Sequence, residues 1–151
     1  MKKTLMGIFS QFVFLLGLLS LSYAYTGSPE MKSYKGIPYL SGGFGAEERE
    51  TLRAMGKEDN LRLSFALQNK DYLGGAQVLI KDEKGRTVLD AVSDGPLFFT
   101  KLPEGNYTIT ATAMGKTIKQ EARIPAKGRT RLYFTWKESN YASETHSMAK
   151  K

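Results

Sequence analysis

Alternation of apolar and polar side chains is the feature that most limits how this chain can fold. In residues 61–68 every second position is apolar, at Leu61, Leu63, Phe65 and Leu67. Successive side chains of a β-strand point to opposite faces of the sheet, so this period of two predicts a strand with one buried and one solvated face. The segment is therefore expected to belong to a sheet that packs on a core from one side.

Six further segments downstream are short, apolar or alternating, and bounded by residues that favour turns. They are residues 76–81, 87–92, 97–102, 107–114, 116–124 and 130–136. An α/β fold would need long helices between the strands, and these connections are too short to hold them. We therefore predict an all-β domain over residues 59–136, built as a seven-stranded antiparallel sandwich.

The region before the sandwich, residues 25–58, is expected to be a linker arm that carries one short helix. Its first half is rich in glycine, serine, proline and tyrosine and shows no period. Residues 46–55 then begin with glutamates, place Leu52 and Met55 on one face, and are followed by Gly56 as a stop. A helix with a single apolar pair is expected to dock on another part of the domain.

The N-terminus has the features of a secretory signal peptide, predicted for residues 1–24. Lys2 and Lys3 precede an apolar run over residues 5–21, and a small residue stands at the third and first positions before the expected cleavage point. The alternative is an uncleaved anchor, because the run approaches the length of about 20 residues that spans a bilayer. Gln11 and the cleavage-like end favour removal, which would leave no stable membrane span.

The composition points to a bacterial periplasmic protein, with secretion as the alternative. The chain has no cysteine, so the exported domain cannot be held by disulfides and must rely on its core. The formal net charge is +7, and removal of residues 1–24, whose only charged residues are two lysines, leaves +5. A mild positive charge outside the cytoplasm favours anionic polymers of the cell envelope or phospholipid headgroups over nucleic acid as partners. Because the basic residues are scattered, an ordinary solvated surface is the preferred interpretation.

Residues 78–124, which include the segment "FFTKLPEGNYTITAT", resemble the carboxypeptidase regulatory-like, or transthyretin-like, domains found in small exported proteobacterial proteins. The matching positions are Phe99, Leu102, Pro103, Gly105, Tyr107, Ile109 and Ala111. The resemblance covers about Leu61 to Trp136 and implies an Ig-like or prealbumin-like sandwich. It implies no activity, because such domains serve as accessory modules beside enzymes, in receptors and in adhesins.

The turn in this motif has a structural explanation. Pro103 restricts φ at the start of the turn, and Gly105 can adopt positive φ. Leu102 and Tyr107 bracket the turn, and a tyrosine here can bury its ring while its hydroxyl reaches a backbone group. These four residues are therefore interpreted as a structural turn motif, not as a catalytic or ligand-binding loop.

The candidates for catalysis are weak, and no catalytic, metal-binding or cofactor-binding residue is predicted. His146 is the only histidine and lies in residues 137–151, a polar segment expected to be a disordered tail. A catalytic triad or a zinc site would need a histidine held rigidly. Asp82, Glu83, Asp90 and Asp94 are interpreted as solvated turn carboxylates, with a loose calcium site at Asp90 and Asp94 as a weaker alternative.

Two aromatic residues suggest a surface that binds a ligand. Tyr133 is out of phase with Phe134 and Trp136, so it should face solvent or the helix, and either Phe98 or Phe99 must lie outside the main core. The leading hypothesis is a non-enzymatic exported domain that binds or scaffolds an unknown protein or glycan of the envelope. The alternative is a small carbohydrate- or peptidoglycan-binding module that uses Phe98 and Tyr133, unless the N-terminal arm covers them.

Overall fold

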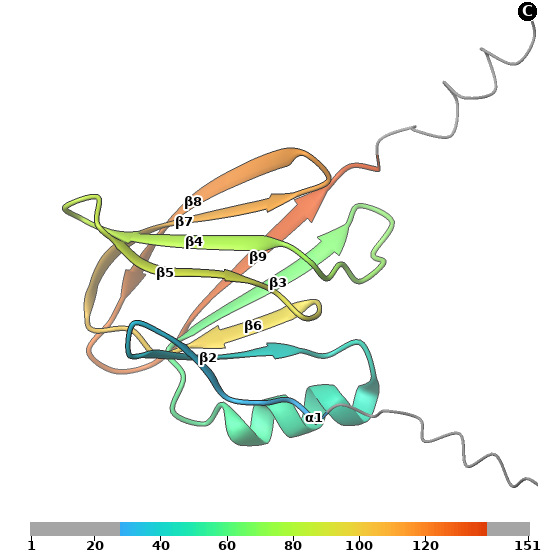
Figure 1. Ribbon diagram of the computed structural model, residues 1–151, viewed down its shortest axis with the longest axis horizontal. Coiled ribbons are helices and arrows are strands. Elements are labelled where there is room, and N and C mark those ends of the chain that lie inside the picture. Colours follow the sequence, from blue (N-terminus) through green and yellow to red (C-terminus); the bar gives the residue numbers. More distant parts are fainter. Residues whose placement is uncertain (1–27, 139–151) are drawn as a thin grey trace, which may run out of the picture.

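The computed structural model describes residues 28–138. The predicted signal peptide, His146 and most of the predicted tail lie outside these residues. Figure 1 shows two facing sheets with a single helix beside the larger one. Among the described residues, no helix is long and apolar enough to cross a membrane. The all-β prediction is confirmed at the level of two β-sheets and one short helix.

Residues 28–138 form nine strands and one helix. In chain order they are β1 (Lys32–Tyr34), β2 (Ile37–Gly42), α1 (Ala46–Met55), β3 (Leu61–Leu67), β4 (Gln77–Asp82), β5 (Thr87–Val92), β6 (Leu97–Thr100), β7 (Gly105–Ala113), β8 (Lys116–Ile124) and β9 (Thr130–Trp136). Sheet A has the order β1-β2-β6-β3-β9, and sheet B has the order β5-β4-β7-β8. The prediction of seven strands is therefore wrong, although all seven predicted segments form strands.

The two additional strands lie in the segment predicted to be a linker. β1 and β2 form a hairpin through Lys35 and Gly36, whose φ values of 46° and 84° are those of a tight turn that matches the twist of antiparallel strands. Ile37 and Tyr39 pack against the main core, and Leu40 points to the opposite side. The linker arm is thus partly a structural component of sheet A.

One strand pair departs from the predicted antiparallel arrangement. β9 pairs with β3 in parallel, from Leu61 opposite Thr130 to Leu67 opposite Trp136. All other strand pairs among the described elements are antiparallel. The parallel pair arises because the chain leaves sheet B after β8 and crosses to sheet A, where β9 runs beside the first predicted strand of the sandwich.

The main core lies between the two sheets and is filled by the alternating residues of the predicted strands. Three aromatic rings, Phe65, Phe134 and Trp136, lie together in it, with ring centroids 5.9 to 6.3 Å apart. A second, smaller cluster lies on the outer face of sheet A, where Leu52 of α1 packs on Leu40 and Phe99. The predicted helix bounds are confirmed, and the helix docks through Leu52.

Side chains close one corner of the sandwich, where β8 of sheet B approaches β9 of sheet A. Three side-chain donors reach main-chain carbonyls across this corner. They are Trp136 Nε1 to Lys116 O at 3.0 Å, Gln120 Nε2 to Tyr133 O at 2.8 Å, and Thr130 Oγ1 to Arg123 O at 2.7 Å. These bonds satisfy carbonyls at two sheet edges and hold the backbone of β9 in place.

Candidate functional site

The predicted turn motif serves the fold. Leu102 is buried, and the Tyr107 hydroxyl donates to the Pro103 carbonyl at 2.8 Å, which is the predicted contact between the ring's polar end and the backbone. Gly105 has a φ of 156°, and a Cβ added there would lie 3.7 Å from the Tyr107 ring. Burial, and then the negative charge of Asp82, raise the pKa of Tyr107 above its usual value of 10.0.

The Tyr107→Phe substitution is expected to lower the free energy of unfolding by about 1 kcal/mol, because the Pro103 carbonyl loses its partner. The folded state holds the phenol proton more tightly than the unfolded chain does. Stability of the parent protein should therefore fall as the pH rises above about 10, and this fall should be smaller in the variant. Urea unfolding at several pH values measures both effects, and identical pH profiles would contradict the buried phenol.

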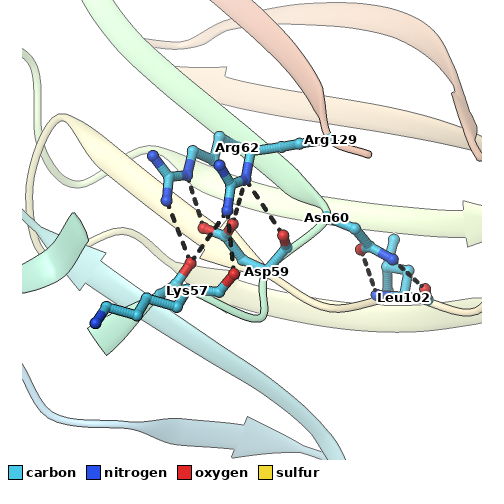
Figure 2. A network of polar contacts seen from close by, with 7 residues as sticks. Lys57, Asp59, Asn60, Arg62, Leu102 and Arg129 are labelled. Carbon is cyan, nitrogen blue, oxygen red and sulfur yellow. Dashed lines mark hydrogen bonds and ion pairs between the residues drawn. The ribbon is translucent and has the colours of Figure 1, made fainter. Parts of the chain in front are cut away.

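A polar network anchors the turn motif to the start of β3. The Asn60 side chain donates to Leu102 O at 2.7 Å and accepts from Leu102 N at 2.9 Å, so one amide pairs with both main-chain groups of a buried residue. Figure 2 shows this pair beside a second contact set centred on Asp59. Neither residue was singled out from the sequence, where "EDN" resembles an ordinary polar loop.

Asp59 is a buried carboxylate shared by two arginines. Arg62 Nε donates to Asp59 Oδ2 at 2.7 Å, and Arg129 Nε forms a short bond with the other carboxylate oxygen. The side chain of Asp59 is only 4 % exposed. Both arginines also donate to Gly56 O at the end of α1. The network therefore joins the helix, β3 and the segment before β9, and its charges are engaged in the fold.

The carboxylates considered as catalytic or calcium-binding candidates also serve local structure. Asp82 accepts bonds from the backbone and side chain of Arg86, and its bonds to Arg86 lower its pKa. Asp94 pairs with Lys32 Nζ at 2.6 Å, and Asp90 accepts from Gln77 at 3.4 Å. Within residues 28–138, no three His, Cys, Asp or Glu side chains lie where they could hold one metal ion.

An open polar hollow of about 540 Å³ lies over sheet B near the β4–β5 turn. Its lining contains lysines, carboxylates, one amide and two hydroxyl side chains. The residues are Lys81, Asp82, Glu83, Gly85, Asn106, Tyr107, Thr108, Lys119 and Glu121. Asn106 and Glu83 bond to each other across it. The lining carries two lysines and three carboxylates, so its positive and negative charges nearly balance.

The proposed binding pair of Phe98 and Tyr133 does not exist as one surface. Phe98 is completely buried and stacks on Tyr39, with ring centroids 5.1 Å apart. Its neighbour Phe99 is the one outside the main core, and α1 covers it. Tyr133 is 68 % exposed, as its phase in β9 predicts. Phe98 is therefore a core residue, and Tyr133 remains a candidate for binding.

Tyr133 lies on the half of the outer face of sheet A that the other described residues leave uncovered. α1 packs over β2 and β6, on the side of the sheet away from β9 (Figure 1). The outward-facing residues of β3 and β9 form the remaining half, which we call the open face; they are Arg62, Ser64, Ala66, Arg131, Tyr133 and Thr135. The open face thus carries one large aromatic ring, two arginines and the hydroxyl groups of a serine and a threonine.

Tyr72 extends the open face, and sequence reasoning missed it. It forms an isolated antiparallel bridge with Ala66, on the side of β3 opposite to β9, and is 54 % exposed. The Arg49 guanidinium of α1 lies 5.0 Å from the centre of its ring. The residue lies in the loop "NKDYLGG", where no alternation marks it. An aromatic side chain in a glycine-flanked loop was the only available signal.

Phe44 lies next to Tyr72 and Arg49 and helps to hold the loop that carries Tyr72 in place. Arg49 donates to the carbonyls of Gly43 and Phe44, both at 3.0 Å. Phe44 is 55 % exposed, and its ring packs on Gly74. A Cβ added to Gly74 would lie 2.7 Å from a carbon of this ring. The loop that carries Tyr72 and the loop before α1 are therefore packed together, with aromatic rings on the surface.

No protein-family model matches this chain, and a search of curated proteins found no match.

Proposed function

We propose that this protein is a non-enzymatic exported domain that acts in the bacterial periplasm. It binds or scaffolds another cell-envelope component, a protein or a glycan, through the open face of sheet A. We also propose that the domain is carboxypeptidase regulatory-like, as the turn motif suggests. The two-sheet architecture and the bond from Tyr107 to the Pro103 carbonyl support this identity. The signal-peptide pattern and the positive charge support the location and an anionic environment.

The exposure of Tyr133 on a rigid strand is the observation that carries the proposal. β9 is held on one side by its ladder with β3 and on the other by the Gln120 bond to the Tyr133 carbonyl. A large aromatic ring on a fixed backbone loses little conformational entropy when a partner covers it. Tyrosine and arginine are also among the residues that contribute most to binding interfaces, and Arg131 lies on the same face.

Envelope co-sedimentation tests this function. The protein is expressed with its own N-terminus in a Gram-negative host, recovered from the periplasmic fraction, and mixed with an isolated envelope fraction. The parent protein is expected to sediment, and Tyr133→Ala is expected to reduce the bound fraction several-fold. Val92→Ala is the matched control, because Val92 is 57 % exposed on sheet B.

Three results would contradict the proposal. The first is retention of the protein in the cytoplasm, which would remove the exported role. The second is equal sedimentation of the parent protein and Tyr133→Ala, which would remove the open face as the site. The third is hydrolase turnover by the purified protein that one carboxylate substitution abolishes, which would show that the domain is an enzyme.

A further inference from the structure

We propose that the open face binds an extended chain of acidic pyranose sugars, with Tyr72 and Tyr133 as two stacking platforms. This inference rests on the proposed function and names the ligand class for the same surface. It uses an element that the sequence did not reveal, the loop residue Tyr72, and the residues that hold it.

The two tyrosines lie on one face, on opposite sides of β3. Tyr133 is in register with Ser64, and Tyr72 is bridged to Ala66. Ser64 and Ala66 alternate with Leu63 and the other buried residues of β3, so both point outward. Strand spacing and rise place the two tyrosine backbones about 12 Å apart. Two rings at this separation can contact different sugar units of one chain.

The surface between the tyrosines carries small side chains. Ser64 and Ala66 are the smallest outward residues of β3, and Thr135 lies beside Ala66 in β9. A pyranose ring presents a flat C–H face that packs on an aromatic ring and a rim of hydroxyls that form hydrogen bonds. Hydroxyl side chains near two exposed rings can contact both the apolar face and the hydroxyl rim of a sugar. The apolar side chains of a protein partner would instead need a pocket.

The two platforms are held in place before a ligand arrives. The Arg49 guanidinium lies over the Tyr72 ring, and two backbone carbonyls fix that guanidinium. The contact of Phe44 with Gly74 fixes the loop from the other side. Tyr133 lies on a strand that pairs with β3 along one edge and accepts a hydrogen bond from Gln120 at the other. Preorganised rings of this kind lower the entropic cost of binding.

Arginines lie at both ends of the surface and favour a ligand with carboxylates. Arg131 is exposed and in register with Arg62, whose charge is engaged by Asp59. Arg49 lies at the other end, beside Tyr72. A planar guanidinium matches a carboxylate with two hydrogen bonds, so Arg131 is the expected partner of an acidic sugar.

A matched pair of oligosaccharides tests the inference. The first probe is a tetrasaccharide of alternating N-acetylglucosamine and N-acetylmuramic acid, which carries lactyl carboxylates. The second is tetra-N-acetylchitotetraose, which has the same linkage and N-acetyl groups and no carboxylate. Binding is measured by calorimetry and by amide shifts in two-dimensional NMR of the purified protein. We expect the acidic probe to bind more tightly and to shift residues of β3, β9 and the Tyr72 loop.

The variants define the site. Tyr72→Ala and Tyr133→Ala are each expected to weaken binding of the acidic probe about tenfold. Arg131→Gln should remove the preference for the acidic probe, and Val92→Ala should change nothing. Unchanged NMR spectra away from the substituted residue show that each variant is folded. Equal affinity for both probes overturns the assignment to acidic sugars.

Failure of this inference can be separated from failure of the proposed function. If neither probe binds but Tyr133→Ala still reduces envelope sedimentation, the open face binds something other than a saccharide chain. Loss of sedimentation after protease treatment of the envelope would then identify a protein partner and overturn the saccharide proposal. If Tyr133→Ala has no effect on sedimentation either, the proposed function fails as well.

Discussion

The Asp59→Ala substitution is expected to lower the free energy of unfolding by about 3 kcal/mol. The carboxylate is buried and is the shared partner of Arg62 and Arg129, whose side chains are 15 % and 24 % exposed. Its removal leaves two partly buried guanidinium groups facing each other without a counter-charge. The contact of Arg62 with the Phe99 ring, at 4.2 Å from the ring centre, should weaken as well. Urea unfolding followed by the fluorescence of Trp136 measures the loss.

Two further variants show that the loss comes from the network. Asp90→Ala removes an exposed carboxylate and is expected to change stability by no more than about 0.5 kcal/mol. Asp59→Asn keeps the size and one acceptor but lacks the charge, so an intermediate loss is expected. If Asp59→Ala were as stable as Asp90→Ala, the two arginines would not depend on Asp59, and the network would not link α1 to β9.

The Phe98→Ala substitution is expected to destabilise the domain by about 3–5 kcal/mol, because it opens a cavity in a packed core. Phe98 is fully buried, stacks on Tyr39, and comes from a strand between β2 and β3. Tyr133→Ala is the matched aromatic truncation, with an expected change of no more than about 0.5 kcal/mol because the side chain is largely exposed. Denaturant midpoints of the two variants give the comparison.

This pair separates folding from binding. Tyr133→Ala is expected to keep the parent stability and lose envelope binding, whereas Phe98→Ala is expected to lose stability and bind normally in the fraction that remains folded. A small effect of Phe98→Ala on stability would mean that its neighbours collapse into the cavity. It would also contradict the role of Phe98 as a central core residue.

The strands from β3 to β9 could be predicted because each is a short apolar or alternating segment bounded by a clear turn. The hairpin of β1 and β2 could not be predicted, because Pro38 and the Lys35–Gly36 pair are typical of a loop. In the structure, Pro38 lies opposite Ser33, and its carbonyl accepts from Thr100. The proline is thus accommodated within sheet A. The parallel pairing of β9 depends on where a connection crosses between sheets, which strand patterns do not encode.

The candidate site was predicted only in part, and the reasons are physical. Tyr133 could be placed outside because two large rings, Phe134 and Trp136, fix the inward phase of β9. Phe98 and Phe99 are adjacent, so alternation requires one on each side and does not say which. A helix from another part of the chain covers Phe99, which makes both residues buried. Tyr72 depends on a loop folding back on β3, which no local pattern indicates.

The parallel pair of β3 and β9 has a consequence for the order of folding. The two strands are separated by residues 68–129, and β9 is the last strand of the part of the chain that the structure describes. A chain synthesised from its N-terminus cannot complete sheet A until residue 136 is free of the ribosome. Until then β3 has an open edge, and contacts between such distant segments form slowly. Truncation before β9 should therefore give an open, aggregation-prone chain instead of a smaller stable domain.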